Sequence, residues 1–161
     1  MSLYQSVQAE LARITCPAAG PVAVSTSAGQ HHFQAELAIL DSLGCSFNAF
    51  EVRSDRLSTA SIEQLKKVAE RLSSRLTYLL EPIKPIEVDT DQCIVQLRSV
   101  PPQKSDDGTS YYELQVARGG VLNLARFHSQ PGQSRERIAA HVTREVFIRL
   151  VKDFEEGSEK C

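Results

Sequence analysis

The clearest pattern in the chain is a pair of alternating apolar and polar runs, residues 111–117 and 121–127, joined by Arg118-Gly119-Gly120. This pattern indicates a β-hairpin. A two-residue glycine loop would divide the leucines between the two faces, whereas a three-residue loop sets Ala117 opposite Val121 and brings them together. Because a buried face specifies register strongly, we expect the three-residue loop, with glycine supplying the positive φ. The predicted core face is Tyr112, Leu114, Val116, Leu122 and Leu124, and the outer face is Tyr111, Glu113, Gln115, Asn123, Ala125 and Phe127.

Apolar side chains recur with helical spacing in two earlier stretches, residues 2–14 and 59–75. Each stretch begins near a serine that is followed three residues later by glutamine, which is the sequence of a capping box. We therefore expect a helix in each stretch. The boxes are Ser2 with Gln5 and Ser61 with Gln64, and Ser58 with a Leu57–Ile62 staple is an alternative start for the second helix.

A third helix is predicted near the end of the chain, from about residue 134 to residue 156, after a Pro131-Gly132 turn. Its apolar residues form one stripe on a helical wheel. Ile148 falls outside that stripe among polar neighbours, and residues 157–161 are expected to fray. The stripe consists of Ala139, Val142, Val146, Phe147, Leu150 and Phe154.

Further strands are expected on both sides of the second helix. Residues 31–53 alternate and should form a hairpin that turns at residues 41–44, although several good helix formers occur before the turn. Residues 77–88 contain two prolines and are expected to form an edge strand, where prolines are tolerated. Residues 93–98 alternate again, and residues 103–110 are expected to form a polar, mobile loop.

The predicted order is therefore α-ββ-α-ββββ-α, an α+β fold in which an antiparallel sheet of about six strands packs on two long helices. This order resembles the TATA-binding-protein-like and helix-grip folds, in which a curved sheet holds a C-terminal helix; the resemblance implies a fold and no function. We divide the chain into an N-terminal amphipathic helix (1–15), a loop or linker rich in small residues (16–29), a single α+β domain (30–156) and a frayed tail (157–161).

Composition is typical of a soluble protein. The 161 residues carry a formal net charge of −2, which gives no overall attraction to nucleic acid or anionic lipid. No apolar run approaches the ~18 residues that a membrane span needs, so we expect no membrane association. The cysteines are widely spaced without a CxxC motif, which favours free thiols and a cytoplasmic location. They are Cys16, Cys45, Cys93 and Cys161.

Groups that could carry catalysis or hold a metal are few. His31 and His32 would point to opposite faces of a strand, so we expect no metal site and no cofactor. No serine lies in a G-x-S-x-G motif and no cysteine in a catalytic signature, so we expect no catalytic residues. Acidic residues cluster around a turn, where they are common for backbone reasons. These acids are Glu81, Glu87, Asp89 and Asp91.

The leading functional hypothesis is a non-enzymatic binding or protein-interaction domain that self-associates into a homo-oligomer. Exposed apolar groups on a soluble domain often mark partner sites, and the outer sheet face and the third helix both provide them. The predicted surface for a ligand or an unknown protein partner is Tyr111, Gln115, Asn123, Phe127 and Ile148.

Two alternatives remain beside this hypothesis. The first is a small-molecule enzyme or carrier with a pocket between the sheet and the C-terminal helix, for which Glu81, Arg98 and Tyr112 are candidate residues. The second is weak nucleic-acid binding, because six arginines and two glutamates give residues 118–149 a net charge of 6 − 2 = +4. No RNP-like motif is present, so nucleic acid is the least favoured partner. The arginines are Arg118, Arg126, Arg135, Arg137, Arg144 and Arg149.

Overall fold

A computed structural model describes residues 1–16, 18 and 20–159. Over these residues the chain forms three α-helices, one 3-10 helix and ten strands. The helices are α1 (Leu3–Ala12), α2 (Ile62–Arg75) and α3 (Arg144–Gly157), and the 3-10 helix η1 spans Asp55–Leu57. The strands are β1 (Val22–Ala28), β2 (His31–Leu40), β3 (Gly44–Ser54), β4 (Ile83–Asp89), β5 (Ile94–Ser99), β6 (Gln103–Ser105), β7 (Gly108–Ala117), β8 (Val121–Ser129), β9 (Glu136–Ile138) and β10 (Ala140–Thr143).

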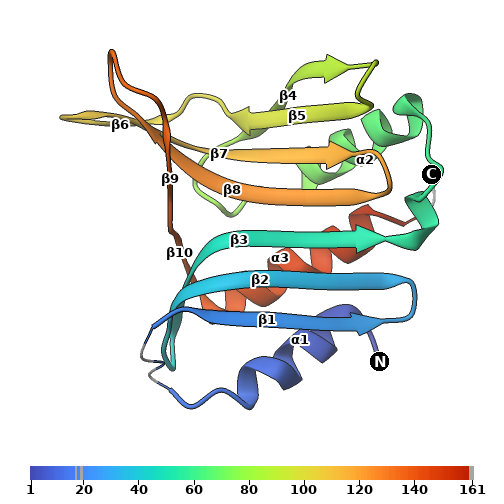
Figure 1. Cartoon of the computed structure of the whole chain (residues 1–161), viewed down its shortest axis with the longest axis vertical. Coiled ribbons are helices and arrows are strands. Elements are labelled where there is room, and N and C mark those ends of the chain that lie inside the picture. The colour runs from blue at the N-terminus through green and yellow to red at the C-terminus, as the bar shows by residue number, and fades with distance from the viewer. Residues whose placement is uncertain (17, 19, 160–161) are drawn as a thin grey trace.

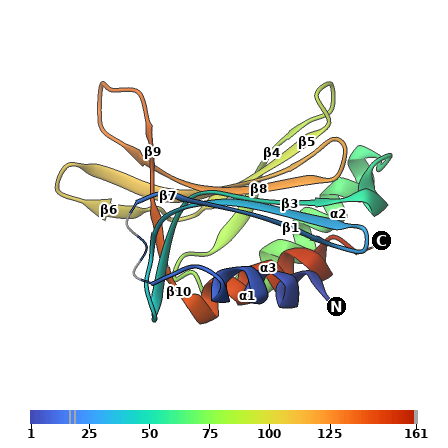
Figure 2. The ribbon, with the colours of Figure 1, turned by 60° about the horizontal axis from the view of Figure 1, so that its bottom comes forward.

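The ten strands of the described chain form one antiparallel sheet with the main order β1-β2-β3-β8-β7-β5-β4. Strands β3 and β8 pair only over Phe50–Arg53 and 121–124. Beyond that point they separate, and β10 pairs with the start of β3 while β9 pairs with the end of β8. The three helices lie along one face of the sheet (Figures 1 and 2). We call the opposite side the open face.

The α+β class and the antiparallel sheet are confirmed, but the prediction of about six strands is wrong. Three of the additional strands, β6, β9 and β10, contain only three or four residues. A segment of that length cannot display a recognisable alternation. These strands exist because longer neighbours offer them backbone partners, which is a tertiary effect.

Local signals were reliable where they involved neighbouring residues. Both predicted capping boxes are present, at Ser2 for α1 and at Ser61 for α2. The β2–β3 hairpin forms as predicted, and Ala117 pairs with Val121 across the three-residue turn between β7 and β8. The predicted core face of that hairpin is buried throughout.

Several predicted segments were wrong. Residues 22–28, assigned to a linker, form β1, because its small residues hide the alternation of Val22 and Val24. Residues 103–110, expected to be a mobile loop, contain β6 and the start of β7. Residues 136–143, expected to be helical, form β9 and β10, and α3 begins only after Thr143, whose hydroxyl accepts from the Val146 backbone N–H at 3.0 Å. The edge strand β4 begins at Ile83, so residues 77–82 are not part of it.

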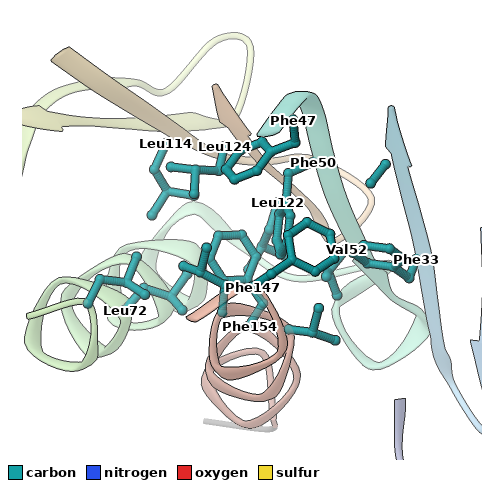
Figure 3. Close-up of a cluster of buried hydrophobic side chains, with 14 of the residues drawn as sticks. Phe33, Phe47, Phe50, Val52, Leu72, Leu114, Leu122, Leu124, Phe147 and Phe154 are labelled. Atoms are coloured by element: carbon teal, nitrogen blue, oxygen red, sulfur yellow. The ribbon is translucent and has the colours of Figure 1, made fainter. Parts of the chain in front are cut away.

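A phenylalanine cluster fills the space between the sheet and α3 (Figure 3). The ring of Phe50 lies at its centre, with its centroid 5.5 Å from that of Phe147 and 5.0 Å from that of Phe154. Phe33 and Phe47 complete the cluster from β2 and β3, and all five side chains are buried. The cavities described below lie elsewhere in the molecule, so the position expected for a pocket is occupied by core side chains.

Helix α1 packs on the body of the protein. Its residues Leu3, Val7 and Leu11 are buried, and the Glu155 carboxylate of α3 accepts from the backbone N–H of Leu3 at 3.0 Å. That contact places a negative charge at the N-terminus of α1, where the helix dipole favours it. Ile148 was expected to be an exposed residue outside the stripe of α3, but it is half-buried against the core, on the side where α3 meets α1.

Candidate functional site

The largest cavity described is a cleft of about 720 Å³ on the helix side of the sheet. It lies where the β6–β7 end of the sheet projects past the helices, which Figure 2 shows at its left margin. The loop before β4, the loop before β6, and the β9–β10 segment form its walls. We call it the Arg126 cleft, and its lining consists of residues 79–82, residues 101–103, Ser110, Tyr112, Arg126, Ile138, Ala139 and His141.

A buried ion pair forms part of this lining. Arg126 Nη2 lies 3.0 Å from Glu81 Oε2 and donates to Gln103 Oε1 at 2.8 Å, and the two charged side chains are only 10% and 12% exposed. The guanidinium lies 4.6 Å above the ring of Tyr112, and burial raises the pKa of that phenol. The opposite charges of Arg126 and Glu81 therefore cancel. The Tyr112 hydroxyl stays protonated near neutral pH.

The same pair leaves hydrogen-bonding capacity unused. Glu81 Oε1 and Arg126 Nη1 are both buried and have no hydrogen-bond partner among the described residues. A buried polar atom without a partner costs about 1–3 kcal/mol. One of these atoms is an acceptor and the other a donor, and both are enclosed by the protein, so a ligand in the cleft reaches them only if the cleft wall shifts.

Leu80 stands at the rim of the cleft in an unfavourable backbone conformation. Its φ is +66°, in the left-handed region, and its side chain is 96% exposed. A left-handed conformation costs a residue with a Cβ atom about 1–2 kcal/mol, and an exposed leucine returns no burial energy. Folding alone would favour glycine or asparagine here. Cys93, outside the cleft, also has a positive φ of +56°, so what distinguishes Leu80 is its exposed leucine side chain at a cleft rim.

Ser110, also in the cleft lining, belongs to a chain of three polar side chains. Its hydroxyl lies 2.8 Å from His128 Nδ1, and His128 Nε2 lies 3.4 Å from Asp107 Oδ2 without hydrogen-bond alignment. A hydrogen bond from Ser105 and the nearby imidazole hold the pKa of Asp107 below its usual range. Asp107 is therefore a carboxylate near neutral pH. Sequence motifs did not predict this arrangement.

The strand register explains the serine–histidine contact. Ser110 and His128 are directly opposite on β7 and β8, and two further Ser–His pairs also lie opposite each other on paired strands. Ser27 contacts His32 Nδ1 at 2.9 Å, and His32 Nε2 contacts Asp55 at 2.9 Å. Ser46 contacts His141 Nδ1. Only Ser110 and His141 of these six residues line the Arg126 cleft.

The residues predicted as a partner surface on the outer face of the hairpin do share the open face, but arginines cover part of them. Tyr111 is only 6% exposed, because the Arg98 guanidinium lies 4.6 Å from its ring centroid. Arg135 lies 3.9 Å from the ring of Phe127 and pairs with the buried Glu113. Hydrogen bonds from Arg135 to Glu113 and Tyr111 raise the pKa of the arginine. This cluster joins β5, β7 and β8 to the segment before β9.

Gln115 and Asn123 belong instead to a polar row that crosses the open face. Each residue of the row pairs directly with the next on the neighbouring strand, from β1 to β4. A second cavity of about 500 Å³ lies over the β1–β7 part of this row. The row is Ser25, Gln34, Glu51, Asn123, Gln115, Gln96 and Glu87.

The structure separates the three residues predicted as pocket candidates. Glu81 and Tyr112 meet in the Arg126 cleft, whereas Arg98 lies on the open face beside Tyr111 and Glu113. Glu87, Asp89 and Asp91 lie on or near the β4–β5 hairpin and do not line the cleft with Glu81. The predicted acidic cluster therefore does not form one site.

The arginine-rich stretch does not form one basic surface. Arg126 is buried against Glu81 on the helix side, and Arg135 is on the open face against Glu113. Arg149 of α3 lies 4.0 Å from the ring of Tyr78, and Arg144 donates to the Asp41 carbonyl at 3.1 Å. The arginines that give this stretch its positive net charge are thus distributed over several sides of the molecule, each in its own contact.

Among the described residues, the cysteines and histidines do not come together as metal ligands. No group of three His, Cys, Asp or Glu side chains suited to a metal ion occurs within residues 1–16, 18 and 20–159. His31 is buried near Glu155 and Glu159, at 4.0 Å from each, while His32 points to the other face. Burial raises the pKa of the Cys45 thiol to about 12, which makes it a poor nucleophile. Cys161 lies outside the described residues.

Comparison with known proteins does not extend this picture. No protein-family model, curated protein or solved structure matches the chain. Within the described part of the chain, no helix is long and apolar enough to cross a membrane.

Two features of the cleft were missed from the sequence. Arg126 was grouped with surface arginines, although it falls on the core face of β8 in the predicted register, beside Leu122 and Leu124. That position was the available signal, because a charged residue on a core face needs a buried partner. Leu80 gave no such signal, since its backbone conformation depends on how α2 connects to β4.

Proposed function

We propose that this protein is a non-enzymatic binding domain whose ligand occupies the Arg126 cleft. The observation that carries the proposal is Leu80, an exposed leucine held at a left-handed φ on the rim of the cleft. A ligand that covers Leu80 recovers the burial energy that the free protein lacks, which amounts to ~1.5–3 kcal/mol for a leucine side chain.

The lining indicates the chemical class of the ligand. A cleft of about 720 Å³ is within the ~300–1,000 Å³ range of sites for small organic molecules. Leu80, Pro82 and Pro102 offer apolar contact, and the Arg126–Glu81 pair adds no net charge. The buried donor of Arg126 and the buried acceptor of Glu81 match a carboxamide or lactam, which accepts at its oxygen and donates at its nitrogen, and the proposal includes a shift of the cleft wall that exposes them when the ligand binds. We therefore propose a neutral amphipathic ligand with such a head group.

A panel of small aryl and alkyl carboxamides tests this proposal, with the matching carboxylic acids and amines as controls. Backbone resonances of Ser110, Tyr112 and Arg126 in a ¹⁵N-resolved NMR spectrum should shift with the carboxamides. The charged controls should leave them unchanged, because a second charge beside a neutralised ion pair remains uncompensated. Shifts confined to the open face, or equal shifts with all three classes, would contradict the proposal.

The Leu80→Gly variant separates ligand binding from folding. We expect the free energy of unfolding to rise by about 0.5–1 kcal/mol, because glycine adopts a positive φ without the left-handed penalty but loses more backbone entropy. Binding of the carboxamides should weaken at least fivefold. Urea unfolding and NMR titration measure the two effects.

Leu43→Gly is the matched control for that variant. Leu43 is also strongly exposed, at 81%, but it lies in the β2–β3 turn, outside the cleft lining, and its φ is not positive. We expect this glycine to leave binding unchanged and to give no gain in stability. If the Leu80→Gly protein is stabilised but binds the carboxamides as well as the wild type does, Leu80 does not contact the ligand.

A second candidate function is hydrolysis of esters, favoured by the position of Ser110 in the cleft lining. Ser110 Oγ would attack the ester carbonyl carbon while its proton moves to His128 Nδ1, and that proton would then pass to the departing alkoxide. Water deprotonated by the same nitrogen would release the acid and restore Ser110. The 2.8 Å contact between Ser110 and His128 is within the distance such a transfer needs.

Turnover of p-nitrophenyl acetate distinguishes this candidate from simple binding. If Ser110 is a nucleophile, the rate of ester hydrolysis by the Ser110→Ala protein should be at least a hundredfold lower than that of the wild type and equal to the rate with free imidazole. Ser27→Ala is the control, because Ser27 makes the same contact with an imidazole outside the cleft lining. Equal hydrolysis rates for the two variants would mean that the three Ser–His pairs serve strand pairing alone.

A further inference from the structure

The two outermost strands of the sheet differ in how well they are protected against pairing with a strand of another molecule. The edge strand β4 contains Lys84 and Pro85, and its ladder with β5 is irregular between Pro85 and Glu87. A charge, a proline and an irregular ladder each hinder the addition of another strand. The edge strand β1 has the sequence Val-Ala-Val-Ser-Thr-Ser-Ala, without charge or proline, and pairs with β2 in one unbroken register over all seven residues.

Helix α1, which packs beside β1, contains a single charged residue, Glu10. Its exposed residues are Gln5, Gln8, Ala9 and Ala12, which are three or four positions apart and so form one stripe. The exposed positions of α2 are different, since they include Glu63, Lys67 and Glu70. Figure 1 shows α1 and β1 together at the same margin of the molecule. Within α1 only Glu10 is charged, and it pairs with Arg13 at 3.4 Å, so the helix adds no net charge beside the uncharged strand β1.

We propose that a second copy of this chain pairs with β1, so that two sheets join antiparallel across a twofold axis at Ser25. A twofold contact places the same residues on both sides, so any charge in the strand would face its own kind or a near neighbour. The β1 sequence avoids that repulsion completely. Its backbone donors and acceptors on the outer edge, which have no strand partner among the described residues, are satisfied in the pair.

The central position of Ser25 in β1 makes this register self-consistent. Val22 would face Ala28 of the second copy and Val24 would face Thr26, which continues the buried, helix-side surface of the sheet. Ala23 would face Ser27, and the two Ser25 side chains would meet on the open face. The polar row that begins at Ser25 would then run without a break across both molecules. A shift by one residue would set the apolar side of one strand against the polar side of the other, so the apolar side excludes such shifts.

Sedimentation equilibrium of the full chain tests the proposal. The wild type should have a mass of twice 17.8 kDa at micromolar concentration. The Ser25→Lys variant places two ammonium groups opposite each other on the axis, and its dimer should dissociate at least tenfold more readily. Gln96→Lys adds the same charge on β5, at the opposite end of the sheet from the β1 edge, and should leave the dimer intact. Thermal unfolding confirms that both variants are folded. A monomeric wild type, or a Ser25→Lys dimer of unchanged affinity, would overturn the proposal.

Oxidative crosslinking tests the register independently of affinity. Opposite residues of an antiparallel pair have Cβ atoms about 4.5–5.5 Å apart, close to the separation in a disulfide. Ser25→Cys should therefore give a crosslinked dimer beyond the level of the wild type, which already contains free thiols. Gln34→Cys, one strand further in, should not. Crosslinking by Gln34→Cys alone would place the contact on the open face instead of the edge. Neither test involves the Arg126 cleft, so their outcome is separate from that of ligand binding.

Discussion

The Arg126→Met variant is expected to lose about 3–5 kcal/mol of unfolding free energy, because it leaves the Glu81 carboxylate buried without its cation. The Glu81 side chain is only 12% exposed, and its Oε2 loses the contact with Arg126 at 3.0 Å. Gln103 loses its donor as well. Urea-induced unfolding followed by circular dichroism measures this change directly.

The double variant Glu81→Leu/Arg126→Met tests the physical reason. Replacing both members of a buried ion pair by apolar residues of similar size is often neutral or stabilising, so the double variant should recover most of the lost stability. It should still fail to bind the carboxamides, because both hydrogen-bonding partners are gone. If the double variant loses the sum of the losses of the two single variants, the pair makes no coupled contribution and the cost belongs to packing alone.

The Gly120→Ala variant is expected to lose on the order of 3 kcal/mol, since two penalties add at one position. Gly120 has a φ of +79°, and a Cβ atom there would lie 2.3 Å from the backbone oxygen of Ser54. That oxygen cannot move easily, because the Ser54 backbone N–H donates to the Gly120 carbonyl at 2.9 Å and ties the turn to the end of β3. Thermal or urea unfolding gives the difference.

Gly119→Ala is the matched control within the same turn. Its φ of +84° is similar, but nothing lies within 4 Å of the position a Cβ atom would take. We expect it to lose only the left-handed penalty of about 1–2 kcal/mol. The difference between the two alanine variants therefore measures the close approach of the turn to Ser54. Equal losses would mean that Ser54 yields and only backbone conformation matters.

The candidate site illustrates which contacts a sequence can predict. Glu81 and Tyr112 were both predicted to line a pocket, and they do meet, but their common partner Arg126 was counted only among the arginines of residues 118–149. The pocket was also placed beneath α3, where Phe50 and Phe147 fill the space. Residue chemistry indicated which side chains needed partners. Which partners these side chains find depends on how the loop before β4 packs against β8, and no local sequence pattern predicts that packing.

Features that depend only on neighbours in the chain follow directly from the sequence. The capping boxes at Ser2 and Ser61 and the turn at 118–120 are local, because their hydrogen bonds and apolar faces involve residues a few positions apart. Long-range contacts, in contrast, make strands of Glu136–Ile138 and Ala140–Thr143, bury Arg126 and leave β1 as an open edge. Each of these depends on which distant backbone or side chain is present to accept a hydrogen bond, to balance a charge, or to leave an edge unpaired. For that reason the function proposed here is placed at the Arg126 cleft and the β1 edge, two sites that fold topology creates.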